Sequence, residues 1–153
     1  MTGLSYTVTI NDRDLVMQLE TLIDKMEDPE PFHRLVGEHM LTSVDERFET
    51  ETAPDGSGWQ AHAPATKRSR LRRNGNAPLT ILRESGRLAG SFSYEASSQN
   101  TKIGTPVIYA AIQHHGGQAG RNHAVTIPSR EILGLSANDE MVIVEIAEDW
   151  LQN

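Results

Sequence analysis

The chain has no cysteine, and this absence excludes several classes of site. Disulfide frameworks, thiolate zinc sites and cysteine nucleophiles all need a thiol. The absence also fits a reducing compartment. Aromatic residues are scarce, at 5% of the 153 residues, and the hydrophobic content is 37%. A chain of this length forms a single domain by the usual length prior, so we interpret 1–153 as one domain with a modest, mostly aliphatic core.

Long apolar segments are also missing. No stretch approaches the run of about 18 apolar residues that a membrane-spanning helix needs. The N-terminus has no basic region followed by an apolar one, as a secretory signal would have. We therefore expect no contact with a membrane and interpret the chain as cytoplasmic where it is made.

Motifs of catalysis and metal binding are absent or weak. No serine lies in a Gly-x-Ser-x-Gly elbow, and no phosphate-binding loop of the Gly-x-x-x-x-Gly-Lys type occurs. His114, His115 and His123 cluster around glycines, but no cysteine or aspartate ligand lies near them. A glycine-rich segment does not hold ligands in a fixed geometry, so a mobile polar loop is the better interpretation. The sequence predicts no enzyme, no metal site and no cofactor.

The basic residues are unevenly distributed. The net charge is −7, which does not favour bulk attraction to nucleic acid or to anionic lipid. Five of the 14 basic residues nevertheless lie in the segment 67–73, namely Lys67, Arg68, Arg70, Arg72 and Arg73. Outside this basic cluster the chain has nine basic and 21 acidic residues. One part of the molecule can therefore attract the rest of another copy.

Three interpretations of the basic cluster remain open. As a nucleic-acid patch it would supply phosphate contacts and a marked salt dependence, but no aromatic residue is interleaved with the cations to stack on bases. As a partner-binding segment it needs only an acidic surface, which the remainder of the chain supplies. It is also compatible with a solvated loop. We favour the partner-binding interpretation.

The N-terminal third shows one strand pattern followed by two helix patterns. Ser5–Ile10 alternates apolar and polar residues and predicts a short strand. Asn11 or Asp12 can cap a helix that continues to about Met26, where apolar residues recur at helical spacing. A second helix is predicted from about 31 to 51, with apolar residues on one stripe and acidic residues outside it. We expect the two helices to pack as a hairpin.

The middle of the chain contains long connections. The segment 53–78 shows neither helical nor strand periodicity and predicts a long flexible loop, whose start we expect Trp59 to pin. A short helix over 80–89 and a β-hairpin over 91–104 follow. The segment 107–114 is ambiguous, with a short helix or irregular turn favoured, and 116–123 predicts a second mobile loop.

The C-terminal segment predicts a brief strand over 125–127 and a final helix. Ser136 and Asp139 have the spacing of a capping box before that helix, although 142–146 is compatible with a strand. The fold class predicted for the whole chain is α+β. It combines an N-terminal helical hairpin, a small antiparallel β-sheet, a C-terminal helix and long mobile loops.

Taken in order, the motifs of the chain resemble those of the phage virion morphogenesis family, which includes Mu-like G proteins and the tail-completion proteins of related myophages. The similarity runs from about Phe32 to Trp150, and it lies in the order and spacing of the motifs more than in any one of them. The residues that carry it are Phe48, Pro54-Asp-Gly56, Trp59, Thr66-Lys67, Ile81-Leu82, Ser85-Gly86, Leu88, Ser91, Gly104-Thr105, Tyr109-Ala110, Gln113, Gly116, Pro128, Arg130, Leu133-Gly-Leu-Ser136 and Asp139. The chain departs from the pattern at His114-His115, where an acidic or aromatic residue often follows the glutamine.

The resemblance implies a structural protein of the phage neck or tail end that acts in tail completion and head–tail joining. Such a protein would form a homo-oligomeric ring, hexameric by that resemblance. Its partners would be the connector and the tail-terminator or tail-tube proteins. It would lie in the host cytoplasm during assembly and afterwards in the virion neck or tail. No cofactor comes with that role, and nucleic acid would enter only as DNA passing through the ring.

The residues that we expect at the interface with partners are Trp59, Lys67, Arg68, Arg70, Arg72, Arg73, Tyr109, Gln113 and Arg130. We expect reversal of Arg70, Arg72 and Arg73 to glutamate to leave folding intact and to block assembly. The alternative function is a nucleic-acid-binding protein that uses the same basic cluster.

Overall fold

The computed structural model describes residues 13–75 and 78–152 as five helices, two short 3₁₀ turns and two two-stranded antiparallel sheets. The α+β class predicted from the sequence is therefore confirmed. In chain order the elements are α1 (Arg13–Glu27), α2 (Glu30–Thr50), α3 (Pro64–Asn74), η1 (Ala89–Ser91), β1 (Ser93–Ala96), β2 (Thr101–Gly104), α4 (Ala110–His115), β3 (Gly117–Ala119), η2 (Arg121–His123), β4 (Val125–Ile127) and α5 (Ala137–Gln152).

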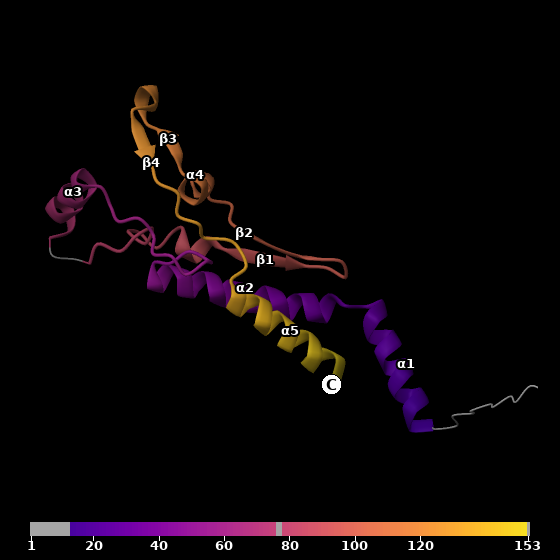
Figure 1. Ribbon diagram of the computed structural model, residues 1–153. Coiled ribbons are helices and arrows are strands. Elements are labelled where there is room, and N and C mark those ends of the chain that lie inside the picture. The colour runs from indigo at the N-terminus through magenta and orange to yellow at the C-terminus, as the bar shows by residue number, and fades with distance from the viewer. Residues whose placement is uncertain (1–12, 76–77, 153) are drawn as a thin grey trace, which may run out of the picture.

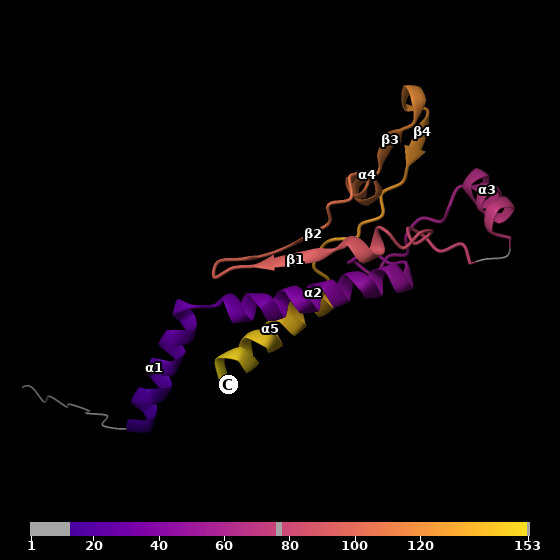
Figure 2. The same ribbon diagram turned by 180° about the vertical axis from the view of Figure 1, so that it is seen from behind.

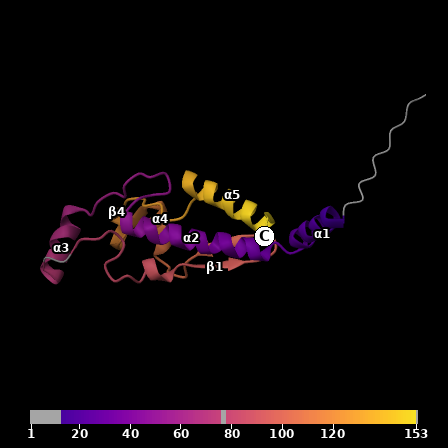
Figure 3. The ribbon, with the colours of Figure 1, turned by 90° about the horizontal axis from the view of Figure 1, so that it is seen from below.

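Helix α2 is the central element of the structure. The hairpin of β1 and β2 lies along one side of it and α5 along another (Figures 1 and 3). Met40, Val44 and Phe48 recur every four residues and are buried, which gives α2 its core-facing stripe. The helix ends where Glu51 adopts the left-handed conformation, with φ of 56°.

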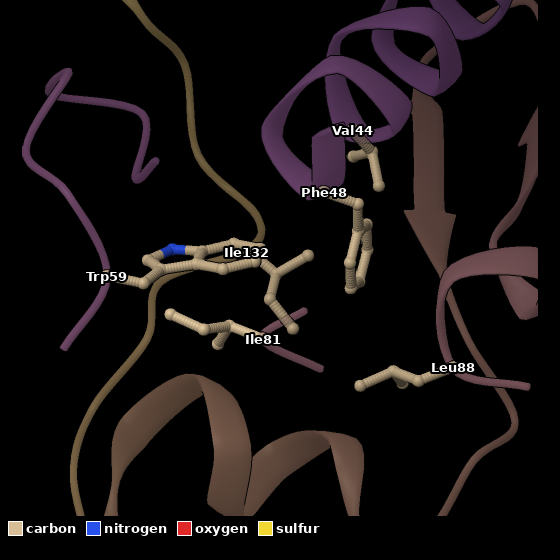
Figure 4. Packing of buried hydrophobic residues seen from close by; sticks show 6 residues of the cluster. All are labelled: Val44, Phe48, Trp59, Ile81, Leu88 and Ile132. Atoms are coloured by element: carbon tan, nitrogen blue, oxygen red, sulfur yellow. The ribbon is translucent and has the colours of Figure 1, made fainter. Parts of the chain in front are cut away.

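The hydrophobic core is small and lies at the C-terminal half of α2. Its buried members are Val44, Phe48, Trp59, Ile81, Leu88 and Ile132 (Figure 4). The rings of Phe48 and Trp59 meet edge to face, with centroids 5.4 Å apart, an arrangement that adds about 1 kcal/mol beyond area burial. Segments without regular structure supply Trp59, Ile81 and Ile132, so the long connections are held to α2 by single apolar anchors.

The hairpin of β1 and β2 lies against α2 because one turn of the helix has no side chain in the way. Gly37 is buried, and a Cβ atom at this position would meet the ring of Tyr94 on β1. In the hairpin Ser93 pairs with Gly104 and Ala96 with Thr101, as the alternating pattern over 91–104 predicts.

Helix α5 begins at a buried carboxylate. The Ser136 backbone N–H and hydroxyl both donate to Asp139 Oδ2, at 2.8 and 2.7 Å, and the Asp139 N–H donates back to Ser136 Oγ at 3.0 Å. This is the capping box that the sequence predicts. The same carboxylate accepts a hydrogen bond from Arg47 of α2, so the cap also fastens α5 to the central helix. The strand interpretation of 142–146 is excluded, since α5 spans that segment.

The second hairpin corrects the prediction of a mobile loop over 116–123. Strands β3 and β4 pair antiparallel across this segment, with Gln118 opposite Thr126, and η2 forms the tip. The hairpin stands away from α2 (Figure 1). Gly116 precedes the hairpin with φ of 72°, and a Cβ at this position would collide with the backbone of Ser129. The absence of a side chain therefore lets the chain at Gly116 lie close to the backbone at Ser129. The brief strand predicted over 125–127 is confirmed as β4, whereas β3 was missed because three residues are too few to show a period.

The two N-terminal helices are present at the predicted positions, but they do not pack as a hairpin. Helix α1 is joined to α2 at a sharp angle through residues 28–29 and has no buried residue (Figures 1 and 2). Its last turn touches the end of α5, where Lys25 Nζ donates to the Trp150 carbonyl at 3.0 Å. The apolar residues Leu19, Ile23 and Met26 of α1 are exposed as a result. The strand predicted over Ser5–Ile10 lies outside the described residues.

Two further predictions about the middle of the chain are wrong. The segment 53–78, expected to be a flexible loop, contains helix α3. The segment 80–89, expected to be a short helix, is irregular up to η1, and Leu82 has φ of 59°, which no right-handed helix accommodates. The ambiguous segment 107–114 includes helix α4, as favoured. No helix among the described residues is long and apolar enough to cross a membrane.

Candidate protein interface

The basic cluster lies on helix α3. Pro64 occupies the first turn, where its missing N–H costs nothing, and Arg72 and Arg73 lie in the last turn, where the helix dipole favours cations. Periodicity alone could not predict this helix, because Leu71 is its only large apolar residue. The helix has no buried residue and projects from the end of the molecule opposite α1 (Figure 1).

Only part of the cluster faces solvent. Lys67, Arg68 and Arg72 are exposed and make no side-chain hydrogen bond or ion pair within the described residues. Arg70 and Arg73 instead bind Glu84 from both sides, with each arginine nitrogen 2.9 Å from a carboxylate oxygen. Arg70 also donates to the Thr80 carbonyl at 2.9 Å and lies 3.0 Å from His62 Nε2. These two arginines hold the segment around 80–84 against α3.

This arrangement corrects the expectation for the reversal of Arg70, Arg72 and Arg73. The Arg70 side chain is 11% exposed, so a glutamate at this position would place a like charge beside Glu84 in a nearly closed site. The triple reversal would therefore damage folding. The exposed set of Lys67, Arg68 and Arg72 is the part of the cluster that can meet a partner without a change in the fold.

Arg130 and Gln113, both assigned to the predicted interface, lie in contact with each other. The Arg130 N–H donates to the Gln113 carbonyl at 2.9 Å, and Arg130 Nη1 lies 3.4 Å from Gln113 Oε1. Arg130 Nε donates to the Gln60 carbonyl at 2.9 Å. The residue is 6% exposed, and no carboxylate among the described residues forms an ion pair with it.

A cavity of about 550 Å³ separates the segment before α3 from strand β4. Arg70 of α3 and Arg130 both line this cavity, although the two residues are far apart in the sequence. The polar part of the lining consists of Gln60, His62, Thr66, Arg70, Gln113, Thr126 and Arg130. The lining contains no acidic residue.

The electrostatics of the cavity are dominated by its two arginines. Burial lowers the pKa of Arg130, the positive charge of Arg70 lowers it further, and Glu51 raises it. Glu51 forms no ion pair with Arg130 among the described residues, and its Oε1 accepts a hydrogen bond from the Ile81 N–H at 2.6 Å. The Nε atom of Arg70 is buried and has no acceptor among the described residues. The site is a recess lined by two cations.

Trp59 belongs to the core and not to an interface. It is 7% exposed, and its Nε1 donates to the Glu131 carbonyl at 2.9 Å. The expectation that Trp59 pins the start of the long connection is confirmed, since the ring packs on Phe48 (Figure 4). Its assignment to the partner interface is wrong.

Tyr109 lies apart from the cavity, at the N-terminal end of α4. It is 42% exposed, and its neighbour Ile108 is 96% exposed. The predicted interface residues other than Trp59 thus divide into an exposed site at 109, an open cavity lined by Arg70, Gln113 and Arg130, and the exposed cations of α3.

The three histidines of the glycine-rich segment do not converge. His114 Nδ1 accepts from the Ile132 N–H at 3.0 Å, and burial, followed by the charge of His115, lowers the pKa of His114, while Glu131 raises it. His123 lies in η2 at the tip of the β3–β4 hairpin. Residues 13–75 and 78–152 contain no group of three or more His, Cys, Asp or Glu side chains that could hold a metal ion.

Sequence reasoning missed Gln60, His62 and Thr126 of the cavity. Each is an ordinary polar residue in an irregular segment or a short strand, so no local pattern distinguishes it. They line one cavity only because Trp59 and Arg130 bring the two segments together.

Comparisons with known proteins agree with the resemblance noted from the motifs. The phage virion morphogenesis family matches residues 10–152. The chain is 30% identical over 142 residues to the Mu-like prophage FluMu G protein 2 of Haemophilus influenzae, an alignment that covers 93% of this chain and 92% of the relative. It is 29% identical over 145 residues to the putative capsid assembly protein G of Escherichia phage Mu, covering 94% and 92% of the two chains. No solved structure matches the chain.

Proposed function

The chain belongs to the phage virion morphogenesis family, and from this premise we propose that it acts in tail completion and head–tail joining as a homo-oligomeric ring in the virion neck. Its partners in that role are the connector on the head side and the tail-terminator or tail-tube proteins on the tail side. It joins the particle from the host cytoplasm, and DNA passes through the ring.

The observation that carries the proposal is the separation of unlike surfaces on one chain of this family. Helix α3 presents the exposed cations Lys67, Arg68 and Arg72 at one end of the molecule, while the chain outside the basic cluster has 21 acidic and nine basic residues. A ring needs a head-to-tail interface, in which two different surfaces of one subunit meet two neighbours. Complementary charge at such an interface speeds encounter and excludes wrong orientations.

Helix α1 supplies a surface of a second kind. Leu19, Ile23 and Met26 are 50%, 57% and 71% exposed, although they recur at the spacing of a core-facing stripe. An exposed apolar stripe of this kind is typical of a site that meets another chain. With α1 and α3 at opposite ends, one copy can contact a neighbour on each side.

The test is disruption of this gene in the parent phage, followed by electron microscopy of the lysate. The proposal predicts DNA-filled heads beside unattached tails, with normal particles restored when the wild-type gene is supplied in trans. Normal infectious particles from the disrupted phage would refute a role in joining.

The phage Mu relative is named a putative capsid assembly protein, which favours a second candidate, a role in capsid assembly. The same micrographs distinguish the two candidates. A capsid assembly protein would leave few or aberrant heads, whereas a joining protein leaves complete heads without tails.

Nucleic-acid binding by α3 is the remaining alternative. Its three exposed cations fit phosphate contacts, but the helix has no aromatic residue on which a base could stack. A gel shift of DNA at micromolar protein that weakens with salt would support this alternative, and a flat titration at low salt would refute it.

A further inference from the structure

Arg130 is a buried cation without an ion-pair partner among the described residues, although Glu51 lies near enough for its charge to raise the pKa of Arg130. It is 6% exposed, and no ion pair reaches it from the described residues. Removing a charge from water without a partner is costly, and proteins normally pair such a group or place it at a site of function. Its Nε donates to the Gln60 carbonyl, and its Nη1 lies 3.4 Å from Gln113 Oε1, so both contacts are to neutral oxygens.

A second arginine, Arg70, adds to the positive charge of the cavity. It lines the same cavity, and its charge already lowers the pKa of Arg130. Glu84 forms an ion pair with Arg70 but shares its charge with Arg73, and the buried Nε of Arg70 has no acceptor among the described residues. Two guanidinium groups that repel each other around an open cavity are stabilised when an anion lies between them.

We propose that this cavity is the receptor for a carboxylate side chain of a neighbouring copy of the chain, bound between Arg70 and Arg130. Carboxylates match the fork of a guanidinium group and form its strongest hydrogen bonds. The cavity, at about 550 Å³, has room for an aspartate or glutamate side chain and the backbone that carries it. This inference specifies the contact within the proposed ring, and only its choice of a second copy as donor rests on the proposed function.

A second copy is the donor that the charges of the chain favour. Acidic residues outnumber basic ones by 21 to nine outside the basic cluster. Asp45 and Glu49 lie four positions apart on α2, are exposed, and form no side-chain hydrogen bond or ion pair within the described residues. Acceptors of the required kind are thus available on the surface of the same protein. A nucleic-acid backbone fits less well, because the exposed cations Arg68 and Arg72 do not line the cavity.

The first measurement is a titration of the purified full chain with glutarate, a mimic of the glutamate side chain, followed by the Nε–H signals of the arginines in NMR spectra. Ionic strength is held constant with sodium chloride, and inorganic phosphate is titrated in parallel. We expect saturable shifts of Arg70 and Arg130 with glutarate and none of Arg72, which lies outside the cavity.

A variant that fills the cavity tests the location without touching either arginine. Thr126 lies on β4 and lines the cavity, and a strand accepts a large aromatic residue. Thr126→Trp should weaken glutarate binding by about tenfold or more, the effect of losing a charged hydrogen bond. Thr126→Ser, which leaves the space open, should bind as the wild type does, and both variants should keep the wild-type amide spectrum away from β4.

The second copy is tested by sedimentation equilibrium up to millimolar protein. Wild-type chain should self-associate, and Thr126→Trp should do so at least about tenfold more weakly, by the same loss. Glutarate that leaves Arg70 and Arg130 unshifted would overturn the receptor, and a response to phosphate alone would point to a nucleic-acid backbone instead. Glutarate binding by a chain that remains monomeric would overturn the second copy as donor. None of these results decides the outcome of the gene disruption, so the two proposals fail separately.

Discussion

Two arginines of this chain are almost equally buried, but only one of them forms an ion pair with a carboxylate of the described residues. Arg47 is 5% exposed and Arg130 is 6% exposed. Arg47 donates to Asp139 Oδ2 at 2.6 Å and to the Ile132 carbonyl at 2.8 Å, while His39 holds the other carboxylate oxygen at 3.0 Å. Arg130 contacts a backbone carbonyl and an amide oxygen, lines a cavity together with a second arginine, and forms no ion pair with a carboxylate of residues 13–75 or 78–152.

The difference separates two kinds of buried cation. Arg47 is paired within the chain, whereas we propose that Arg130 is paired by another molecule. Asp139 fixes Arg47 within the chain, and the pair joins α2 to α5. Arg130 has a partial substitute for such a partner in Gln113 and Gln60. In the proposed ring, the Arg47 pair would stabilise the subunit, whereas the Arg130 site would be completed only in the assembly.

The largest effect is expected where the paired arginine loses its acid. Asp139→Ala leaves Arg47 buried and uncompensated, which should lower the free energy of unfolding by about 3–5 kcal/mol. Urea titration followed by circular dichroism measures the loss. The matched control is Glu140→Ala on the same turn of α5, an exposed site where a change within about 0.5 kcal/mol is expected. An unchanged midpoint for Asp139→Ala would remove the contrast between the two arginines.

The next effect is a loss of stability in acid. Burial would raise the pKa of Asp139, but hydrogen bonds from Ser136 and Ser43 and the charge of Arg47 outweigh it and lower the pKa from 3.8 to about 2. The unfolded chain then binds the proton more tightly than the folded chain does. The pair therefore contributes about 2 kcal/mol above pH 3.8, and this contribution is lost as the pH falls through about 2.

The measurement is the free energy of unfolding at a series of pH values for wild type and Asp139→Asn. Every other carboxylate titrates in both proteins, so the difference between the two curves isolates Asp139. The difference should shrink as the pH falls through that interval, and a constant difference would contradict the role of the charge.

A smaller effect is expected at the unpaired arginine. Arg130→Met should cost about 1 kcal/mol of stability, the value of its hydrogen bond to Gln60, because no carboxylate is left unpaired. Arg47→Met is the matched change at the paired site, and it should cost several times more since it strands Asp139. If thermal unfolding showed that Arg130→Met and Arg47→Met lose equal stability, both arginines would act only in stabilising the folded chain.

The smallest effect on stability is expected on the exposed face of α3. The triple change Lys67→Glu, Arg68→Glu and Arg72→Glu should alter the free energy of unfolding by no more than about 0.5 kcal/mol, and it should sharply reduce the yield of joined particles in trans complementation. The control reverses three exposed cations outside α3, namely Arg87, Lys102 and Arg121. Equal particle yields from the two triple variants would remove α3 from the mechanism.

The elements that the sequence predicts correctly are those determined by local contacts. Helix α2 and the β1–β2 hairpin follow from apolar spacing, and α5 follows from the reciprocal hydrogen bonds of Ser136 and Asp139. The expectation that Trp59 anchors the long connection is confirmed, because a large apolar residue in a polar segment is stabilised by burial in the core.

The wrong predictions depend on partners distant in the sequence. Helix α3 has little apolar pattern, and the Thr80 carbonyl and Glu84 hold it through Arg70. The stripe of α1 predicts a buried face, but periodicity does not say which molecule covers that face. The cavity shows the same limit, since Arg70, Gln113 and Arg130 could be assigned to an interface from the motifs while their meeting in one recess could not.

The most direct test of this account is a structure of the assembled virion by electron cryomicroscopy, at a resolution that shows side chains. The account predicts a ring of this chain in the neck, with a carboxylate from an adjacent copy within about 4 Å of both Arg70 and Arg130, the distance of an ion pair. A ring in which the cavity opens to solvent would contradict the role of the unpaired arginine, and a neck without the chain would contradict the proposed function.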